Sequence, residues 1–263
     1  MLRQSHFIRA LPAVLLLSAA SLLPGCGGST NPTDTPRVAT GSKNTQGLWR
    51  ITEKFDNETF YSTALIEGTG STVAMTDCSR AFASDSLTRS SNQYTGYTHD
   101  IAPLTIINND AMTWTYDNQT RDFEKMDVNP QFNMGNFTLS SSLLPNVVAS
   151  QLVCTQFSTS DQGESLVLTT RVLGNPLLIT IRLKNGFKVG TYNISPYGDE
   201  PTMVIFSGPH WALTTLLAYD EVATGTLTIK SRGNVWIEGE LQGQLLNGNQ
   251  PVNVSFNVET PVH

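Results

Sequence analysis

Charged residues are scarce in this 263-residue chain. Asp, Glu, Lys and Arg together make up 14% of it, whereas a globular protein usually contains about a quarter. The sequence has no run of basic residues, and its net charge is −6. An acidic chain without a basic cluster lacks the electrostatic attraction that nucleic acids require. We therefore expect no nucleic-acid partner.

Motifs for common catalytic and cofactor sites are also missing. The sequence contains no Gly-x-Ser-x-Gly elbow, no glycine loop of the phosphate-binding type and no calcium-binding loop. The histidines and cysteines do not occur at metal-ligand spacing. We therefore predict no cofactor and no metal site. The four scattered histidines are His6, His99, His210 and His263.

Two of these histidines are candidates for a Ser-His-Asp triad. His99 precedes Asp100, and His210 precedes Trp211. A triad depends on geometry that spacing does not reveal. The alternative for each is a surface or hydrogen-bonded histidine without a catalytic role.

Cysteine is rare, and its three positions have different surroundings. Cys26 follows the N-terminal apolar run, which leaves Cys78 and Cys154 as an even pair. In an oxidising compartment such a pair is expected to form a disulfide. Two buried free thiols are the alternative, because spacing does not show that the residues meet.

The only long apolar run lies at the N-terminus. Arg3 and Arg9 supply a positive start, and residues 10–23 are almost wholly apolar. This run is shorter than the roughly 20 residues that a helix needs to cross a bilayer. A positive start, an apolar run and small residues in this order predict a secretory signal peptide at 1–25.

The residues at the end of that run are Leu23-Pro24-Gly25-Cys26. They resemble the lipobox of bacterial lipoproteins, which implies that Cys26 is acylated and becomes the new N-terminus. Two or three acyl chains would hold the protein on a membrane, its expected partner. In such lipoproteins an aspartate after the cysteine favours the inner membrane, so Gly27 favours the outer membrane of a Gram-negative cell. An ordinary signal peptide with Cys26 as a spare thiol is the alternative.

Residues 26–43 form a polar stretch before the foldable part of the chain. Gly, Ser, Thr, Asn and Pro dominate it, and such a composition buries too little apolar surface to fold. We predict a disordered tether. Without residues 1–25, 14 basic residues face 22 acidic ones, a net charge of −8.

From residue 44 to 263 the apolar residues alternate with polar ones. A period of two indicates strands that have one buried and one solvated face. We therefore predict an all-β fold, an antiparallel sandwich or barrel-like meander with little helix. The clearest runs contain Trp49 and Ile51; Met112, Trp114 and Tyr116; Leu177, Ile179, Ile181 and Leu183; and Val252, Val254, Phe256 and Val258.

Glycine and asparagine clusters predict turns between these runs. They lie at 67–70, 108–110, 184–186, 232–234 and 247–249. One stretch, 142–153, is expected to be helical because Pro145 suits the first turn of a helix. A polar, Pro-containing stretch at 128–145 divides the region into two halves, about 44–130 and 150–263, that either pack together or form one structure.

Residues 236–242 carry the most specific pattern. In a strand, Trp236, Glu238, Glu240 and Gln242 would share one face. Two neighbouring carboxylates could approach the separation of about 5–5.5 Å that retaining glycosidases use. The pattern distantly resembles the acidic strand of concanavalin-like glycoside hydrolases, although Gln242 stands where that family has a third acid. The alternative is a solvated strand face.

The first predicted strand offers another interpretation. Gly47-Leu48-Trp49 resembles the opening of lipocalin-type barrels, which implies a carrier of a small apolar ligand. A core tryptophan without a ligand is the alternative. Our preferred hypothesis is an envelope-anchored binding or assembly module with a protein or glycan partner. The Glu238 and Glu240 enzyme and the carrier remain as alternatives.

The lipoprotein assignment predicts a specific N-terminus. We expect mass spectrometry of the mature protein to find a first peptide that begins at Cys26 and carries acyl chains. Cys26→Ser should abolish acylation and release the protein from the membrane fraction. An unmodified peptide that begins elsewhere would contradict the assignment.

Overall fold

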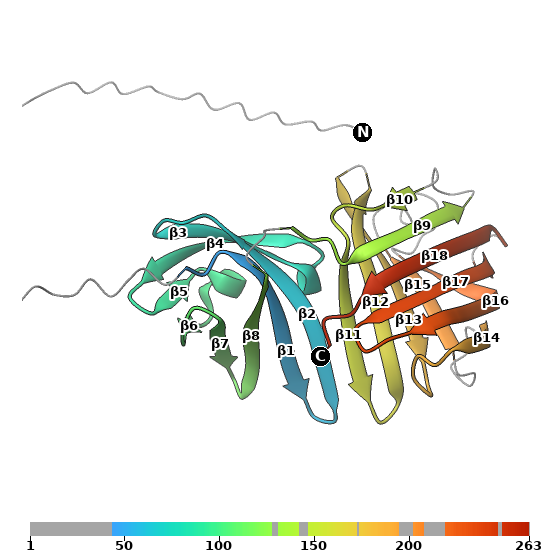
Figure 1. Ribbon diagram of the computed structural model, residues 1–263, viewed down its shortest axis with the longest axis horizontal. Coiled ribbons are helices and arrows are strands. Elements are labelled where there is room, and N and C mark those ends of the chain that lie inside the picture. The colour runs from blue at the N-terminus through green and yellow to red at the C-terminus, as the bar shows by residue number, and fades with distance from the viewer. Residues whose placement is uncertain are drawn as a thin grey trace, which may run out of the picture. The chain divides into compact units, whose positions relative to one another are not determined.

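Strands make up nearly all the regular structure of the computed structural model (Figure 1). It describes residues 44–127, 131–141, 147–172, 174–194, 202–207, 219–246 and 249–262. The helical elements in these ranges are two short 3-10 turns, η1 (Cys78–Arg80) and η2 (Tyr97–Asp100). No helix there combines the length and apolar surface that crossing a bilayer requires. The all-β prediction is confirmed.

The first eight strands form a closed antiparallel barrel. Each pairs with the next along the chain, and β8 pairs back with β1. The strands are β1 (Gly47–Phe55), β2 (Glu58–Glu67), β3 (Thr72–Asp77), β4 (Ala83–Ser90), β5 (Gln93–Thr95), β6 (Leu104–Ile106), β7 (Ala111–Tyr116) and β8 (Gln119–Asp127). The ring has the strand number that the lipocalin resemblance implies.

Side chains fill the interior of this barrel. Fourteen buried apolar and aromatic residues form one cluster there, as expected for eight strands, whose ring is just wide enough for side chains. Trp49 is fully buried, and its indole N–H donates to the Thr45 carbonyl at 2.8 Å. The Lys125 ammonium lies 5.6 Å from the centre of the Trp49 ring. Trp49 is therefore a core residue of a packed barrel.

Ten further strands form a second region. They are β9 (Gly135–Ser141), β10 (Val147–Ala149), β11 (Cys154–Ser160), β12 (Gly163–Val172), β13 (Asn175–Leu183), β14 (Gly190–Ile194), β15 (Thr202–Ser207), β16 (Tyr219–Arg232), β17 (Trp236–Leu245) and β18 (Pro251–Glu259). One sheet runs β11-β12-β13-β15-β16, and another runs β10-β9-β18-β17-β16-β14. Their inner faces share one apolar cluster, and their strands cross at a large angle in Figure 1.

The long strand β16 belongs to both sheets. Its first residues pair with β15, and residues 225–229 pair with β14. Gly225, where the second pairing begins, has φ +154°, and a Cβ atom there would lie 2.3 Å from the Gln242 carbonyl oxygen. Only glycine lets the two backbones approach this closely. This residue therefore permits one strand to pass between the two sheets.

One strand of the barrel continues into the second region. Thr59–Tyr61 of β2 pair with β11, whereas Ala64–Glu67 of β2 pair with β3. Ser62 and Thr63 lie between these two ladders, at a point that we call the fork. The sheet is therefore continuous from barrel to second region.

A disulfide joins the two regions beside the fork. Cys78 follows β3, Cys154 begins β11, and both are fully buried. The bond lies in a small cluster of its own with Leu48, Leu65, Phe82 and Phe132. The predicted pairing of Cys78 with Cys154 is confirmed.

The alternation of apolar residues predicts the buried faces correctly. Val252, Val254, Phe256 and Val258 are buried, and the residues between them are exposed. The turns at 67–70, 108–110 and 232–234 join strands that pair directly. The turn at 184–186 leads instead to β14, which pairs with β16. The turn at 247–249 lies partly outside the described residues.

The helix expected at 142–153 was wrong where the structure describes that stretch. Val147–Ala149 form strand β10, which pairs with β9. Val147 and Val148 are β-branched and favour a strand once a partner edge is available. Local propensity at Pro145 could not reveal that edge.

The disulfide predicts a measurable loss when it is removed. Cys78→Ala together with Cys154→Ala, in a Cys26→Ser chain, should lower the free energy of unfolding by about 4 kcal/mol, because the unfolded chain gains the freedom of a long loop. The sequence separation of the two cysteines is 76. Urea unfolding measures the change in three samples: the double alanine variant, the Cys26→Ser chain with its disulfide, and the same Cys26→Ser chain after reduction as the control. Equal unfolding midpoints in all three samples would contradict the prediction.

Candidate functional site

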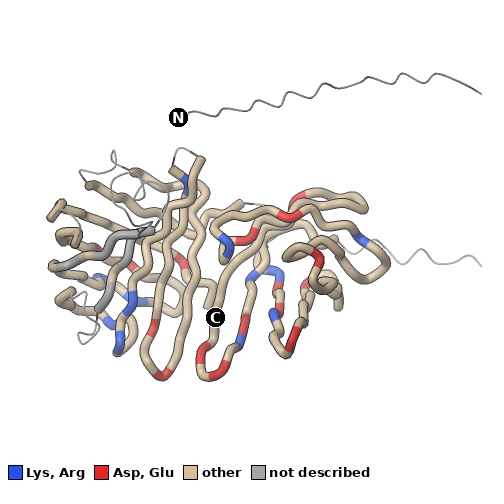
Figure 2. Tube along the Cα trace, turned by 180° about the vertical axis from the view of Figure 1, so that it is seen from behind, with Lys and Arg blue, Asp and Glu red and all other residues tan. Residues whose placement is uncertain are grey.

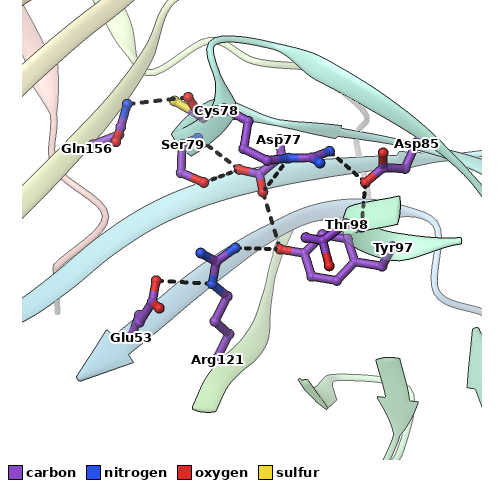
Figure 3. A network of polar contacts seen from close by, with 10 residues as sticks. Glu53, Asp77, Cys78, Ser79, Asp85, Tyr97, Thr98, Arg121 and Gln156 are labelled. Carbon is purple, nitrogen blue, oxygen red and sulfur yellow. Dashed lines mark hydrogen bonds and ion pairs between the residues drawn. The ribbon is translucent and has the colours of Figure 1, made fainter. Parts of the chain in front are cut away.

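A network of charged and hydroxyl groups closes one end of the barrel (Figure 3). Glu53 comes from β1, Asp77 from the end of β3, Asp85 from β4, Tyr97 from the start of η2 and Arg121 from β8. In Figure 3 their polar groups point toward one another across the barrel end. The network therefore draws on four of the eight barrel strands and on η2.

Asp77 is the centre of this network. Its carboxylate is fully buried and accepts hydrogen bonds from the Ser79 amide at 2.8 Å and the Ser79 hydroxyl at 2.7 Å. The Tyr97 hydroxyl donates to it at 3.3 Å, and Arg80 Nε lies 3.6 Å away. A buried carboxylate is tolerated only when it is hydrogen-bonded and paired in this way.

Arg80 extends the network to a neighbouring strand. Its guanidinium lies 2.5 Å from the Asp85 carboxylate, which also accepts from the Thr98 amide at 3.1 Å. Thr98 to Asp100 have positive φ values between 48° and 64°. Non-glycine residues adopt this backbone conformation at a cost, and the hydrogen bond from the Thr98 amide to Asp85 helps to hold it.

Tyr97 and Arg121 link the barrel interior to its rim. Arg121 Nη1 donates to the Tyr97 hydroxyl at 3.0 Å, and Arg121 Nε donates to Glu53 at 3.0 Å. Burial, followed by the negative charge of Asp77, raises the pKa of Tyr97 well above its usual 10.0, although Arg121 opposes the shift. Burial alone would lower the pKa of Arg121, but Tyr97, Glu53 and Asp77 outweigh it and raise that pKa.

The pKa shifts of Tyr97 and Arg121 both lead away from neutral pH. General acid or base catalysis works best when the pKa lies near the working pH, and both shifts move away from it. The direction of the two shifts therefore does not favour proton transfer by Tyr97 or Arg121 at neutral pH. Their arrangement closes the barrel end and fixes the position of Arg121.

A small concavity, which we call the fork hollow, lies beside this network. Its volume is about 170 Å³, and its lining comes from β1, β2, β8, η1, β11 and β12. It therefore lies where the barrel wall continues into the second region. Its lining includes Glu53, Phe60, Ser62, Arg121, Gln156 and Ser165.

A larger concavity, which we call the outer groove, has a volume of about 610 Å³. It lies on the other face of β2, because Leu65 of the groove and Ser62 of the hollow point to opposite faces of that strand. Arg171 Nη2 donates to the Phe82 carbonyl at 2.8 Å across the groove. Residues from both regions line it, among them Leu65, Phe82, Phe132, Gln151, Leu152 and Arg171.

Glu238 and Glu240 lie on one face of β17, as expected, and Trp236 is 42% exposed. Glu240 is 2.6 Å from the ammonium of Lys230, and this hydrogen bond raises the pKa of the lysine. Neither the fork hollow nor the outer groove is lined by any of these three residues. The structure therefore places the two carboxylates on one strand face, beside neither of these two concavities.

Other predicted site residues have different positions. His99 is exposed on η2. The Asp100 carboxylate accepts a hydrogen bond from the Gly96 amide at 2.9 Å, so it does not orient His99 as a triad would require. Within the described ranges, no group of three or more His, Cys, Asp or Glu is arranged to hold a metal ion. Four predicted residues lie outside the described residues: Cys26, His6, His210 and His263.

Comparisons with protein-family models, curated proteins and solved structures find no match for this chain. The arguments for its function therefore come from its own residues.

Sequence reasoning missed the network and both concavities. Arg121 and Asp122 alternate like any strand pair, and nothing local shows that Arg121 is the inward one. Asp77 directly precedes Cys78. A carboxylate next to a disulfide-bonded cysteine is a sequence signal that could have indicated a buried charge. Tyr97 stands in a short turn without any pattern around it.

The network predicts an alkaline loss of stability. Because the pKa of Tyr97 is higher in the folded protein than in the unfolded chain, folding retains its proton, and stability should fall as pH rises above about 10. Tyr97→Phe should lower the free energy of unfolding at neutral pH by about 1–3 kcal/mol and flatten this alkaline decline. Urea unfolding across pH measures both effects.

Tyr116→Phe is the matched control, because Tyr116 is 47% exposed on β7. It should leave both the neutral stability and the alkaline decline unchanged. A Tyr97→Phe protein whose alkaline decline matches that of the unsubstituted chain would refute the prediction.

Proposed function

We propose that this chain is an exported lipoprotein that acts as a binding module of the cell envelope. Cys26 carries its lipid anchor, residues 26–43 are its tether, and the outer groove is its binding surface. The partner is an uncharged polar polymer of the envelope, a glycan or a polypeptide segment. The outer membrane of a Gram-negative cell is the proposed location.

The outer groove is the observation that carries this proposal. Its volume of about 610 Å³ is within the range of ligand-binding clefts. Glu67 and Arg171 are its charged lining residues, and Arg171 is engaged with the Phe82 carbonyl. Uncharged polar side chains line much of the rest: Thr76, Ser84, Gln131, Asn133, Ser150 and Gln151.

The floor and rim of the groove suit a polar polymer. Phe82 and Phe132 pack edge to face with ring centres 5.3 Å apart and are buried. Leu152 is 52% exposed at the rim. Amide and hydroxyl groups around an apolar base can orient a partner by hydrogen bonds. The adjacent disulfide keeps the two walls together, so little order has to be created on binding.

The two alternative functions receive less support. The Glu238 and Glu240 pair faces outward and lines neither the fork hollow nor the outer groove, so neither concavity can present a substrate to these carboxylates. Fourteen buried apolar and aromatic side chains pack inside the barrel, which leaves little room there for the apolar ligand of a lipocalin-like carrier. A tethered binding module requires neither feature.

Added negative charge in the groove tests the proposal. We expect the Cys26→Ser protein to sediment with isolated cell-wall sacculi, and the assay is repeated with protease-treated sacculi. Gln151→Glu with Asn133→Asp should weaken this retention about tenfold or more, because each carboxylate would lose water without gaining a counter-charge.

Gln93→Glu with Gln242→Glu is the matched control, since it adds equal charge at exposed amides that line neither concavity. It should bind like the unsubstituted protein. Loss of retention after protease treatment identifies a protein partner, and persistence identifies a glycan. Equal retention of groove and control variants, or no retention at all, would contradict the proposal.

A further inference from the structure

The fork hollow rests on one continuous sheet face. Arg121 of β8 pairs with Glu53 of β1, which pairs with Phe60 of β2. Phe60 pairs with Ser158 of β11, which pairs with Ser165 of β12. Residues directly opposite each other on neighbouring strands project from the same face. These five side chains therefore form one row across five hydrogen-bonded strands, and all of them line the hollow.

The charges in this row compensate each other. Arg121 Nε lies 3.0 Å from Glu53, so the row carries no uncompensated charge. The turns at the end of these strands carry acidic residues. Asp161 of the β11–β12 turn accepts a hydrogen bond from the Asn57 side-chain amide of the β1–β2 turn at 3.4 Å. Figure 2 shows further acidic positions at hairpin turns along the same lower edge. Because Arg121 and Glu53 pair with each other, the row itself offers no unpaired charge to an ionic ligand.

Hydroxyl and amide groups supply the remaining polarity. The Gln156 side-chain amide donates to the Cys78 carbonyl at 3.3 Å, which leaves its own carbonyl oxygen as an acceptor. The Ser79 hydroxyl donates to Asp77, so its lone pairs can still accept. Ser158 and Ser165 add hydroxyls that can donate or accept. Such groups match a ligand that is itself covered with hydroxyls.

Ser62 provides a second, independent observation. It is 5% exposed and lines the hollow, and its hydroxyl has no hydrogen-bond partner among the described residues. Leaving a buried hydroxyl unpaired is unfavourable, and native structures rarely do so without a reason. It lies at the fork, where β2 pairs with neither β3 nor β11. A polar ligand in the hollow would give the Ser62 hydroxyl a hydrogen-bond partner.

Apolar walls complete the hollow. Ile51 and Val167 lie beside the serines, and the Phe60 ring is 40% exposed at the rim. The volume of about 170 Å³ slightly exceeds the roughly 150 Å³ of a cavity that holds benzene. One six-membered ring is therefore the size that fits. An apolar ring face and hydroxyl edges match these walls and serines.

We propose that the fork hollow binds a single neutral sugar ring, with its apolar face against Phe60 and its hydroxyls toward Gln156, Ser158 and Ser165. The site is separate from the outer groove, because it lies on the opposite face of β2. Its function does not depend on the partner of that groove.

A titration with a defined probe tests this site. Methyl β-D-glucopyranoside added to the Cys26→Ser protein should shift the backbone NMR signals of Ser62, Ser158 and Ser165 in a saturable way, with Kd on the order of 1 mM. Phe60→Ala should weaken binding about tenfold. Ser165→Leu, which fills the hollow, should abolish the shifts.

Phe55→Ala is the matched control, since Phe55 is an exposed phenylalanine of the same hairpin that does not line the hollow. It should bind the sugar like the unsubstituted protein, and each variant is checked for its native spectrum. Indole, inorganic phosphate and choline serve as apolar, anionic and cationic probes. Saturable shifts by one of these in place of the sugar, sugar binding that survives Ser165→Leu, or no saturable shift with the sugar would each overturn the proposal.

Discussion

Strand β2 pairs with two different strands, β11 and β3, along one edge, and the rest of the structure depends on this division. Its later residues close the barrel against β3, and its early residues leave that edge for β11. Backbone groups in a sheet must find hydrogen-bond partners, so the ring can close and the sheet can continue only if the two ladders part. Ser62 and Thr63 mark where they part.

The elements around this point hold β3 and β11 together where their ladders with β2 part. The η1 turn follows β3 and places Cys78 against β11, where the disulfide and the bond from Gln156 hold it. The residue before η1, Asp77, accepts the Ser79 amide and so caps this short turn. Its buried charge then requires Tyr97 and Arg80. The network at the barrel end is thus connected to the fork through Asp77 and the adjacent Cys78.

Part of this architecture could be read from the sequence. The strand faces followed from alternation, as in Val252 to Val258, because burial of one face is a local property of the pattern. The cysteine pair followed from the expected compartment. Ring closure between β1 and β8 could not be predicted, since it depends on which distant strands pair. The inward charges of Asp77 and Arg121 were missed because a polar residue at a strand end has the same local pattern whether it faces solvent or caps a barrel. Glu238 and Glu240 were assigned to the correct face, but alternation does not reveal whether a face is covered.

The place of β1 in the ring also has a mechanical consequence. This strand comes first in the described chain and is held on both sides, by β2 and by β8, along most of its length. A force that pulls the first residue of β1 along the strand axis would be resisted in shear by both ladders, with many hydrogen bonds loaded at once. Such a geometry is suited to a domain that must stay folded while its surroundings pull on it.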